Sequence, residues 1–221
     1  MQKYNKLLLT TEFLLIFGIL PTVINHLELH EYFLILLWLF ALIVYIYLKN
    51  SKSFDKTEFW NAKAINSKNL IRISALFFPA VIIITAGTYI LEPERFLQFM
   101  LTNTGMWVLV MIFYPILSVY PQELIYRSFI FHRYKNLFNN NIAMILASAV
   151  AFGYVHIIFN NWVAVILSTF GGLIFATTYH RFKSLGLVCI EHALYGCFIF
   201  TVGLGWYFYR GAVGLNDIIG S

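Results

Sequence analysis

Long apolar runs constrain this chain more than any other feature. Seven of them follow one another with short polar stretches between, roughly at residues 7–25, 32–48, 73–91, 98–120, 142–159, 162–179 and 185–204. About 20 apolar residues suffice for a helix to cross the hydrocarbon core of a bilayer. Charged residues make up only 11% of the 221 residues, whereas about 25% is usual in soluble domains. We therefore predict an all-α, polytopic transmembrane helix bundle of about seven spans, forming a single membrane domain over residues 1–221.

Basic residues alternate between the ends of these predicted spans. The N-terminus and the loops after the second, fourth and sixth spans hold most of them: Lys3, Lys6, Lys49, Lys52, Lys56, Lys63, Lys68, Arg72, Arg133, Lys135, Arg181 and Lys183. Loops rich in lysine and arginine stay on the cytoplasmic side, so we expect a cytoplasmic N-terminus and an external C-terminus. The same loops explain the net charge of +5. We therefore expect the lipid bilayer as a partner, and no nucleic acid.

The loop at 49–72 alternates lysines with aromatic side chains, among them Phe54, Phe59 and Trp60. A segment of this composition can lie in the membrane interface as a short amphipathic helix. A solvated loop accounts for it equally well, so the sequence leaves both interpretations open.

Ionisable side chains within or beside the apolar runs are the candidates for function, because they are costly in the hydrocarbon region and face a bundle interior, a cavity or a partner. They are Glu12, Glu123, Arg127, His156, Glu191 and His192. On a helix, Glu123 and Arg127 project from one face at i,i+4 spacing and can pair. His156 and Asn160 repeat that spacing, whereas the adjacent Glu191 and His192 face different directions.

Each of these groups also has a purely structural interpretation. Glu123 and Arg127 can form a neutralising pair without catalytic work, and His156 can be a hydrogen-bonded core residue. Glu191 either faces another helix or is protonated in an apolar setting. Glu12 has no partner visible in the sequence, and we expect it to be protonated or near the membrane interface.

The combination of these groups on three spans is more informative than any one of them. Glu123, His156 and His192 supply a carboxylate and two imidazoles from the fourth, fifth and seventh predicted spans. Such a set suits water activation with a second group stabilising the oxyanion. It also suits a Glu/His/His site for zinc or another divalent metal. The chain has no His-Glu-x-x-His, Gly-x-Ser-x-Gly or Gly-rich phosphate motif, so any site must form between helices.

These residues resemble the motifs of the CAAX-protease and bacteriocin-processing intramembrane proteases, also called the CPBP or Abi family. That family has Glu-Glu-x-x-x-Arg, then Phe-x-x-x-His with an Asn often four residues on, then a late His-x-x-x-Asn-type motif. The counterparts in this chain are Gln122-Glu123-x-x-x-Arg127, Phe152-x-x-x-His156 with Asn160, and His192-x-x-x-Gly196. The resemblance covers roughly residues 105–205.

The resemblance implies an intramembrane endopeptidase, often labelled a metalloprotease, that hydrolyses a membrane-embedded or membrane-proximal peptide with activated water. By this resemblance, Glu123 and His156 activate the water and His192 stabilises the oxyanion. Gln122, Arg127 and Asn160 complete the implied site. Any zinc or other divalent metal would be held by Glu123, His156 and His192. We expect the membrane to be a bacterial inner membrane.

Two departures from the family pattern limit what the resemblance implies. Gln122 stands where the family has its first glutamate, and an amide does not accept a proton at neutral pH. Gly196 stands where a side-chain donor is expected. Three accounts follow: Glu123 supplies the carboxylate, or His156 suffices as the base while Gln122 orients water, or the chain is catalytically impaired.

Two other functions compete with proteolysis. A catalytically impaired relative would act as a membrane binding, chaperone or immunity protein, as the two departures suggest. A transporter would use the same buried charges as a proton relay, although the spans show no inverted repeat. We favour the protease, because Glu123, Arg127, His156, Asn160 and His192 are all present.

Overall fold

The computed structural model describes residues 5–138 and 140–208, so Lys3 and the C-terminus, which enter the predicted orientation, lie outside the described residues. Within these ranges, seven helices are long and apolar enough to cross a membrane: Lys6–His26, Leu29–Asn50, Ser67–Leu91, Thr104–Arg133, Asn141–Phe159, Trp162–Phe182 and Leu185–Val202. The same ranges contain no β-strand. The predicted all-α bundle of seven spans is confirmed.

Several spans combine α-helix with short π-helical or 3₁₀-helical turns. In chain order the elements are α1 (Lys6–Leu14), the π-helix η1 (Leu15–Ile19), α2 (Leu20–His26), the 3₁₀-helix η2 (Leu29–Tyr32), α3 (Phe33–Asn50), the 3₁₀-helices η3 (Lys56–Phe59) and η4 (Ala62–Ala64), α4 (Ser67–Leu91), α5 (Gln98–Thr102), α6 (Thr104–Tyr114), the π-helix η5 (Pro115–Val119), α7 (Tyr120–Glu123), the π-helix η6 (Leu124–Phe129), α8 (Ile130–Arg133), α9 (Asn141–Val155), the 3₁₀-helix η7 (His156–Phe159), α10 (Trp162–Phe182), α11 (Leu185–Val202) and the 3₁₀-helix η8 (Leu204–Phe208).

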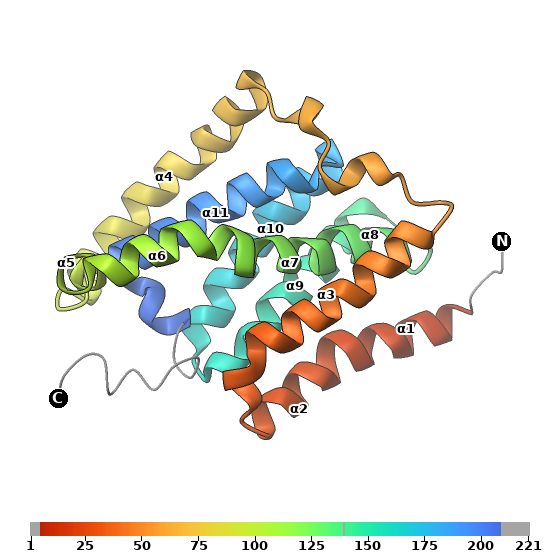
Figure 1. The fold of residues 1–221 in the computed structure, drawn as a ribbon, viewed down its shortest axis with the longest axis horizontal. Coiled ribbons are helices and arrows are strands. Elements are labelled where there is room, and N and C mark those ends of the chain that lie inside the picture. Colours follow the sequence, from red (N-terminus) through yellow and green to blue (C-terminus); the bar gives the residue numbers. More distant parts are fainter. Residues whose placement is uncertain (1–4, 139, 209–221) are drawn as a thin grey trace.

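The helices α9, α10 and α11 lie in the middle of the bundle, and the long fourth span, α6 to α8, runs across them (Figure 1). Helices α1 and α4 lie at opposite margins. Burial follows this arrangement: 56% of the most apolar window of the fifth and seventh spans is buried, against 6% for α4. The main apolar core joins the fourth span to these inner helices. The second and third predicted motifs therefore lie on the two spans that the bundle shields best from lipid.

The fourth span differs from the prediction at both ends. We expected residues 98–120, but the span covers Thr104–Arg133, and residues 98–102 form the separate helix α5. The chain breaks at Leu97, which has a left-handed φ of 56°, and again at Asn103, which has φ −129° and ψ 50°. Helical structure then continues through η5 and η6 to Arg133. The first motif therefore lies inside the span and not at its end.

Glu12 has charged and polar partners that the sequence did not reveal. Its carboxylate Oε1 accepts hydrogen bonds from Arg133 Nε at 2.8 Å and from the Tyr134 hydroxyl at 3.0 Å. Burial, together with the Glu12 carboxylate, raises the pKa of the Tyr134 phenol, so this hydroxyl stays protonated and donates. The partners lie 121 and 122 residues away along the chain. A protonated Glu12 is therefore not needed to explain its position.

The loop after α3 folds back onto the bundle and contains only the short 3₁₀-helices η3 and η4. Phe54 is buried. The Tyr179 hydroxyl donates to Glu58 Oε2 at 2.7 Å, and Ser184 Oγ donates to the Trp60 carbonyl at 2.9 Å. These contacts attach the loop to the junction between α10 and α11. The loop is thus attached to the bundle by side-chain contacts, and its position relative to the membrane interface stays a prediction.

The Arg133–Glu12 pair gives a test of how the first span is held. Replacing Arg133 by Met should lower the free energy of unfolding by about 1–3 kcal/mol, because the partly buried Glu12 carboxylate loses its guanidinium. Thermal unfolding in detergent measures this change. Lys52→Met, at an exposed lysine of the loop after α3, is the matched control and should leave the midpoint unchanged. Equal midpoints for both variants would show that the pair contributes nothing.

Candidate active site

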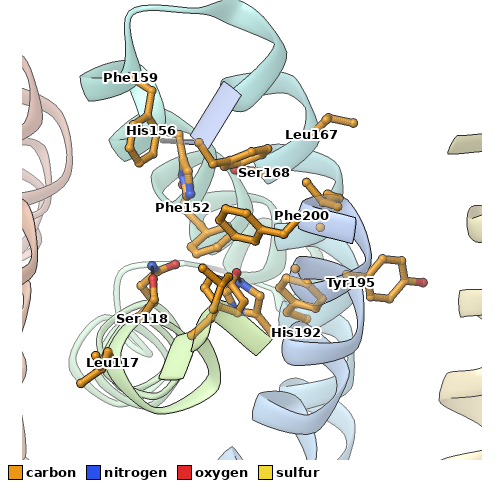
Figure 2. Close-up of a pocket in the computed structure, with 18 of the residues that line it drawn as sticks. Leu117, Ser118, Phe152, His156, Phe159, Leu167, Ser168, His192, Tyr195 and Phe200 are labelled. Carbon is orange, nitrogen blue, oxygen red and sulfur yellow. Dashed lines mark hydrogen bonds between the residues drawn. The ribbon is translucent and has the colours of Figure 1, made fainter. Parts of the chain in front are cut away.

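A cavity of about 500 Å³ lies between the fourth span, α9, α10 and α11, and residues of α3, α4 and η8 complete its wall. Its volume is within the range of small-ligand sites. Most lining side chains are apolar, and the polar ones are Tyr114, Ser118, Gln122, His156, Ser168, His192 and Tyr195. Figure 2 shows His156 and His192 on the cavity wall with Phe152 between them. Two of the three predicted site groups therefore share one cavity.

The fourth span presents a row of side chains to this cavity. Val110, Tyr114, Ser118 and Gln122 are spaced four residues apart, and all line the cavity. In a regular α-helix, positions four apart drift around the axis by about 40° per step. The π-helix η5 lies in the middle of this row, and a π-helical turn holds more residues than an α-helical one. The π-helix therefore reduces the drift and keeps Gln122 on the same face as Tyr114.

Glu123 and Arg127 form a fully buried ion pair, with both side chains 0% exposed. Arg127 Nε lies 3.0 Å from Glu123 Oε2, as the i,i+4 spacing predicts. The guanidinium also donates through Nη1 to Ser148 Oγ at 2.8 Å and lies over the Phe152 ring, 4.8 Å from its centre. Neither member of the pair is among the residues that line the cavity. Glu123 is therefore placed behind the cavity wall.

His192 connects this ion pair to the cavity. Its Nδ1 lies 2.8 Å from Glu123 Oε1, and its Nε2 lies 3.0 Å from the Tyr114 hydroxyl. Because a carboxylate can only accept, Nδ1 carries a hydrogen. The ring stacks on Phe175 at 4.6 Å between centres and meets the edge of Phe152 at 5.4 Å. These contacts fix the position and the tautomer of His192.

His156 is held by a different acceptor. It follows α9 and begins η7, and its Nδ1 lies 2.7 Å from the Phe152 carbonyl oxygen. A carbonyl accepts only, so Nδ1 donates and the neutral ring keeps its lone pair on Nε2. The rings of Phe159 and Phe208 lie 5.8 Å from the His156 ring. His156 is thus oriented by the backbone and shielded by aromatic groups.

Gln122 occupies the cavity wall at the position where the resemblance implies an acid. Its Nε2 donates to Ser118 Oγ at 2.7 Å. Its Oε1 is buried and has no hydrogen-bond partner among the described residues. An unpaired buried acceptor costs about 1–3 kcal/mol, which a donor entering the cavity would relieve.

Two other predicted positions lie away from the cavity. Asn160 is exposed, with a left-handed φ of 54°, and does not line the cavity. The expected common face of His156 and Asn160 is wrong, because α9 ends at Val155 and residues 156–159 form a 3₁₀-helix. Glu191 is buried, and neither carboxylate oxygen has a hydrogen-bond partner within the described ranges. It faces away from the cavity, as its adjacency to His192 predicts.

Tyr114 is a cavity residue that the sequence interpretation missed. It is one of fourteen tyrosines, and its aromatic neighbours resemble ordinary core residues. The available signal was its spacing: Tyr114 precedes Ser118 and Gln122 by four and eight residues. That signal is weak, because only the π-helix brings the row to one face.

The residues predicted to bind a metal do not fit such a site. Among the residues that the structure describes, no three His, Cys, Asp or Glu side chains are grouped so that they could hold an ion. Both Glu123 oxygens face protein partners, Arg127 and His192, and His156 Nδ1 faces a backbone carbonyl. A metal bound to this set would have to displace those contacts.

One family model matches part of the chain. Residues 101–198 match the family model described as Type II CAAX prenyl endopeptidase Rce1-like. Comparisons with curated proteins and with solved structures gave no match. The matched range includes every polar residue of the cavity wall. This family consists of proteases, so the match supports an intramembrane endopeptidase activity for the chain in general terms. The predicted resemblance to the CAAX-protease and bacteriocin-processing family is therefore confirmed, through an Rce1-like match over residues 101–198.

Proposed function

We propose that this protein is an intramembrane endopeptidase that hydrolyses a peptide bond with water activated by His156. The observation that carries the proposal is the pair of imidazoles on one apolar cavity, each fixed through Nδ1 by a different acceptor. His156 is fixed by the Phe152 carbonyl, and His192 is fixed by the Glu123 carboxylate. Because the two acceptors differ, we assign the two rings different roles in the reaction.

His156 is suited to act as the general base. With Nδ1–H bound to the carbonyl, the neutral ring offers the lone pair of Nε2. No described residue forms a hydrogen bond to Nε2, so a water molecule in the cavity can donate to it. The unpaired Gln122 Oε1 supplies a second acceptor on the same wall. Water has two hydrogens, and two acceptors of this kind would orient its oxygen lone pair away from the wall.

His192 is suited to stabilise the oxyanion. The Glu123 carboxylate accepts the Nδ1–H of His192 and orients the ring, in the manner of the acid–histidine pair of hydrolytic triads. With a second proton taken from bulk water before the reaction, His192 keeps Nδ1–H on Glu123 and presents Nε2–H toward the cavity. Donors aimed at a developing negative charge supply a large share of catalysis in a dry site.

The proposed reaction balances without a covalent intermediate. The water oxygen attacks the carbonyl carbon of the substrate while His156 Nε2 takes one water proton. The C–O bond formed in this step leaves a tetrahedral oxyanion that accepts a hydrogen bond from His192. Collapse of this intermediate breaks the C–N bond, and His156 returns the proton to the leaving amine. One water is consumed for each peptide bond cleaved.

Glu123 has an indirect role in this proposal. We had expected it to activate water together with His156, but its burial and its two partners support a role in holding His192. Arg127 in turn neutralises Glu123. The proposal therefore follows the account in which His156 suffices as the base and Gln122 orients water.

The cavity wall supports an apolar, membrane-associated substrate. Several side chains line the cavity and are also exposed on the outside of the bundle: Leu34, Met106, Leu109, Phe113, Leu117 and Phe170. In a membrane protein these side chains face lipid, so the cavity lies within reach of a chain in the bilayer. We propose a membrane-embedded or membrane-proximal peptide as substrate. The description of the matched family names a CAAX prenyl endopeptidase, so a prenylated CAAX peptide is the first substrate to test.

We also propose that the basic loops face the cytoplasm, as the alternation of charge predicts. The packing supports this, because the loop after α3 contacts the junction of α10 and α11. Asn61 Nδ2 donates to the carbonyls of Phe182 and Lys183 at 3.1 and 3.2 Å. Loops assigned to one side of the membrane are thus in contact.

The histidines give the first test of the proposal. Purified protein in detergent should cleave a quenched fluorescent peptide with a prenylated CAAX end. His156→Ala should lower kcat/KM by about 10²–10⁴-fold, because the general base is lost. His180→Ala, in the last turn of α10 and outside the cavity, is the control, with thermal midpoints as a check of folding. Equal rates in His156→Ala and wild type would contradict the proposal.

Gln122 separates the protease from a catalytically impaired binding protein, the function that Gln122 and Gly196 favour as the alternative. Gln122→Glu should not raise the hydrolysis rate of an active protease, because a poorly solvated carboxyl on the cavity wall has no counter-charge to keep it ionised as a base. Gln122→Met, similar in size, should lower the rate. Hydrolysis by Gln122→Glu but not by the wild-type protein would indicate a degenerate protease. Absence of hydrolysis by both the wild-type protein and Gln122→Glu would favour the binding role.

Metal removal gives an independent test. Because both Glu123 oxygens already have protein partners, we expect the rate to be unchanged after dialysis against a strong chelator, with metal content measured on the same sample. Loss of activity that added zinc restores would show that the Glu123/His156/His192 set binds metal after rearrangement, and would contradict the proposed mechanism.

A further inference from the structure

The space beside Gly196 is filled by a residue from another helix. Gly196 lies one turn after His192 on α11, and both line the cavity. A Cβ built on Gly196 would overlap the ring and the hydroxyl oxygen of Tyr114. Any larger side chain at position 196 would therefore compete with Tyr114 for the same volume. The glycine and the tyrosine are structurally coupled.

The Tyr114 hydroxyl occupies the space where the Cβ of a side chain at position 196 would lie. Its oxygen is 3.0 Å from His192 Nε2, and the two rings meet edge to face at 6.0 Å between centres. Phe200 packs against the other side of the phenol at 5.4 Å. Tyr114 is the last residue of α6, directly before the π-helix η5. The aromatic contacts and the π-helix thus fix the hydroxyl beside His192.

We propose that Tyr114 is a catalytic residue that donates the second hydrogen bond to the oxyanion, in place of the side chain absent at Gly196. This inference rests on the proposed function. The tautomer of the ring decides which atom donates in the contact between His192 Nε2 and the Tyr114 hydroxyl. When Nε2 carries a hydrogen, as the proposed function requires, it is itself a donor, and the Tyr114 hydroxyl hydrogen is free for another acceptor. An oxygen placed about 3 Å from both atoms then receives two hydrogen bonds, the arrangement of an oxyanion hole.

The simplest variant removes only the hydroxyl. Tyr114→Phe should lower kcat by about 10²–10³-fold with little change in KM, because the lost hydrogen bond forms in the transition state. Tyr120→Phe, on the same span but outside the cavity wall, is the matched control and should retain the wild-type rate. Both are assayed on the quenched prenylated CAAX peptide in detergent. Wild-type kcat in Tyr114→Phe would overturn the inference.

An exchange of donors distinguishes catalysis from mere positioning of His192. Gly196→Asn alone should reduce activity, because the new side chain collides with Tyr114. Combining Gly196→Asn with Tyr114→Ala should raise kcat roughly tenfold or more above Tyr114→Ala alone, because a donor returns to the same place. Equal kcat in the double variant and in Tyr114→Ala, with matching thermal midpoints, would show that the tyrosine acts only through packing.

Two outcomes distinguish a failure of the proposed function from a failure of the role proposed for Tyr114. Absence of hydrolysis by the wild-type protein would remove the proposed function and this inference together. Hydrolysis that is lost in His156→Ala but unchanged in Tyr114→Phe would keep the protease and remove only the role of Tyr114.

Discussion

The buried ion pair between Glu123 and Arg127 is the interaction on which the rest of the site depends. Placing two charges at 0% exposure costs several kcal/mol for each ion unless both are paired and hydrogen-bonded. The structure meets part of that requirement with groups from several helices: Ser148 and the Phe152 ring for the guanidinium, and His192 for the carboxylate. Arg127 Nη2 has no hydrogen-bond partner among the described residues. The pair therefore ties the fourth span to α9 and α11, and its geometry requires all three helices to be in place.

The structural and catalytic interpretations of this pair are not alternatives. Because Arg127 neutralises Glu123, the carboxylate stays available to hold Nδ1–H of His192. That contact orients Nε2 toward Tyr114 and the cavity wall. A pair that never touches the cavity thus determines the tautomer of a residue that does. Loss of either charge would be expected to disturb folding and the site together, so His156, which is held by a backbone carbonyl, is the better residue for isolating chemistry.

The sequence predicted those features of the fold and site that depend on local spacing. Apolar length predicted seven spans, and the i,i+4 rule predicted the contact of Glu123 with Arg127. Features that depend on departures from regular helix were missed. A 3₁₀-helix turns Asn160 away from the cavity, and a π-helix brings Tyr114 into line with Gln122. Contacts between distant segments, such as Glu12 with Arg133, leave no periodic signal. The burial of Glu123 behind the cavity wall could not be predicted either, because spacing gives a side chain's direction but not what covers it.

The amide at Gln122 is consistent with the electrostatics of this cavity. A carboxylate base must be ionised to work, and burying it in apolar surroundings requires a counter-charge. Arg127 is already engaged by Glu123 and Ser148, and within the described ranges no Lys or Arg lines the cavity. An imidazole is neutral in its base form, so His156 can be buried without a counter-ion and becomes charged only after it has taken the proton. In the proposed mechanism, that charge forms together with the oxyanion, and the two opposite charges stabilise each other in a site of low polarity. The neutral imidazole base therefore adds no buried charge at rest, and its positive charge forms only beside the negative charge of the oxyanion.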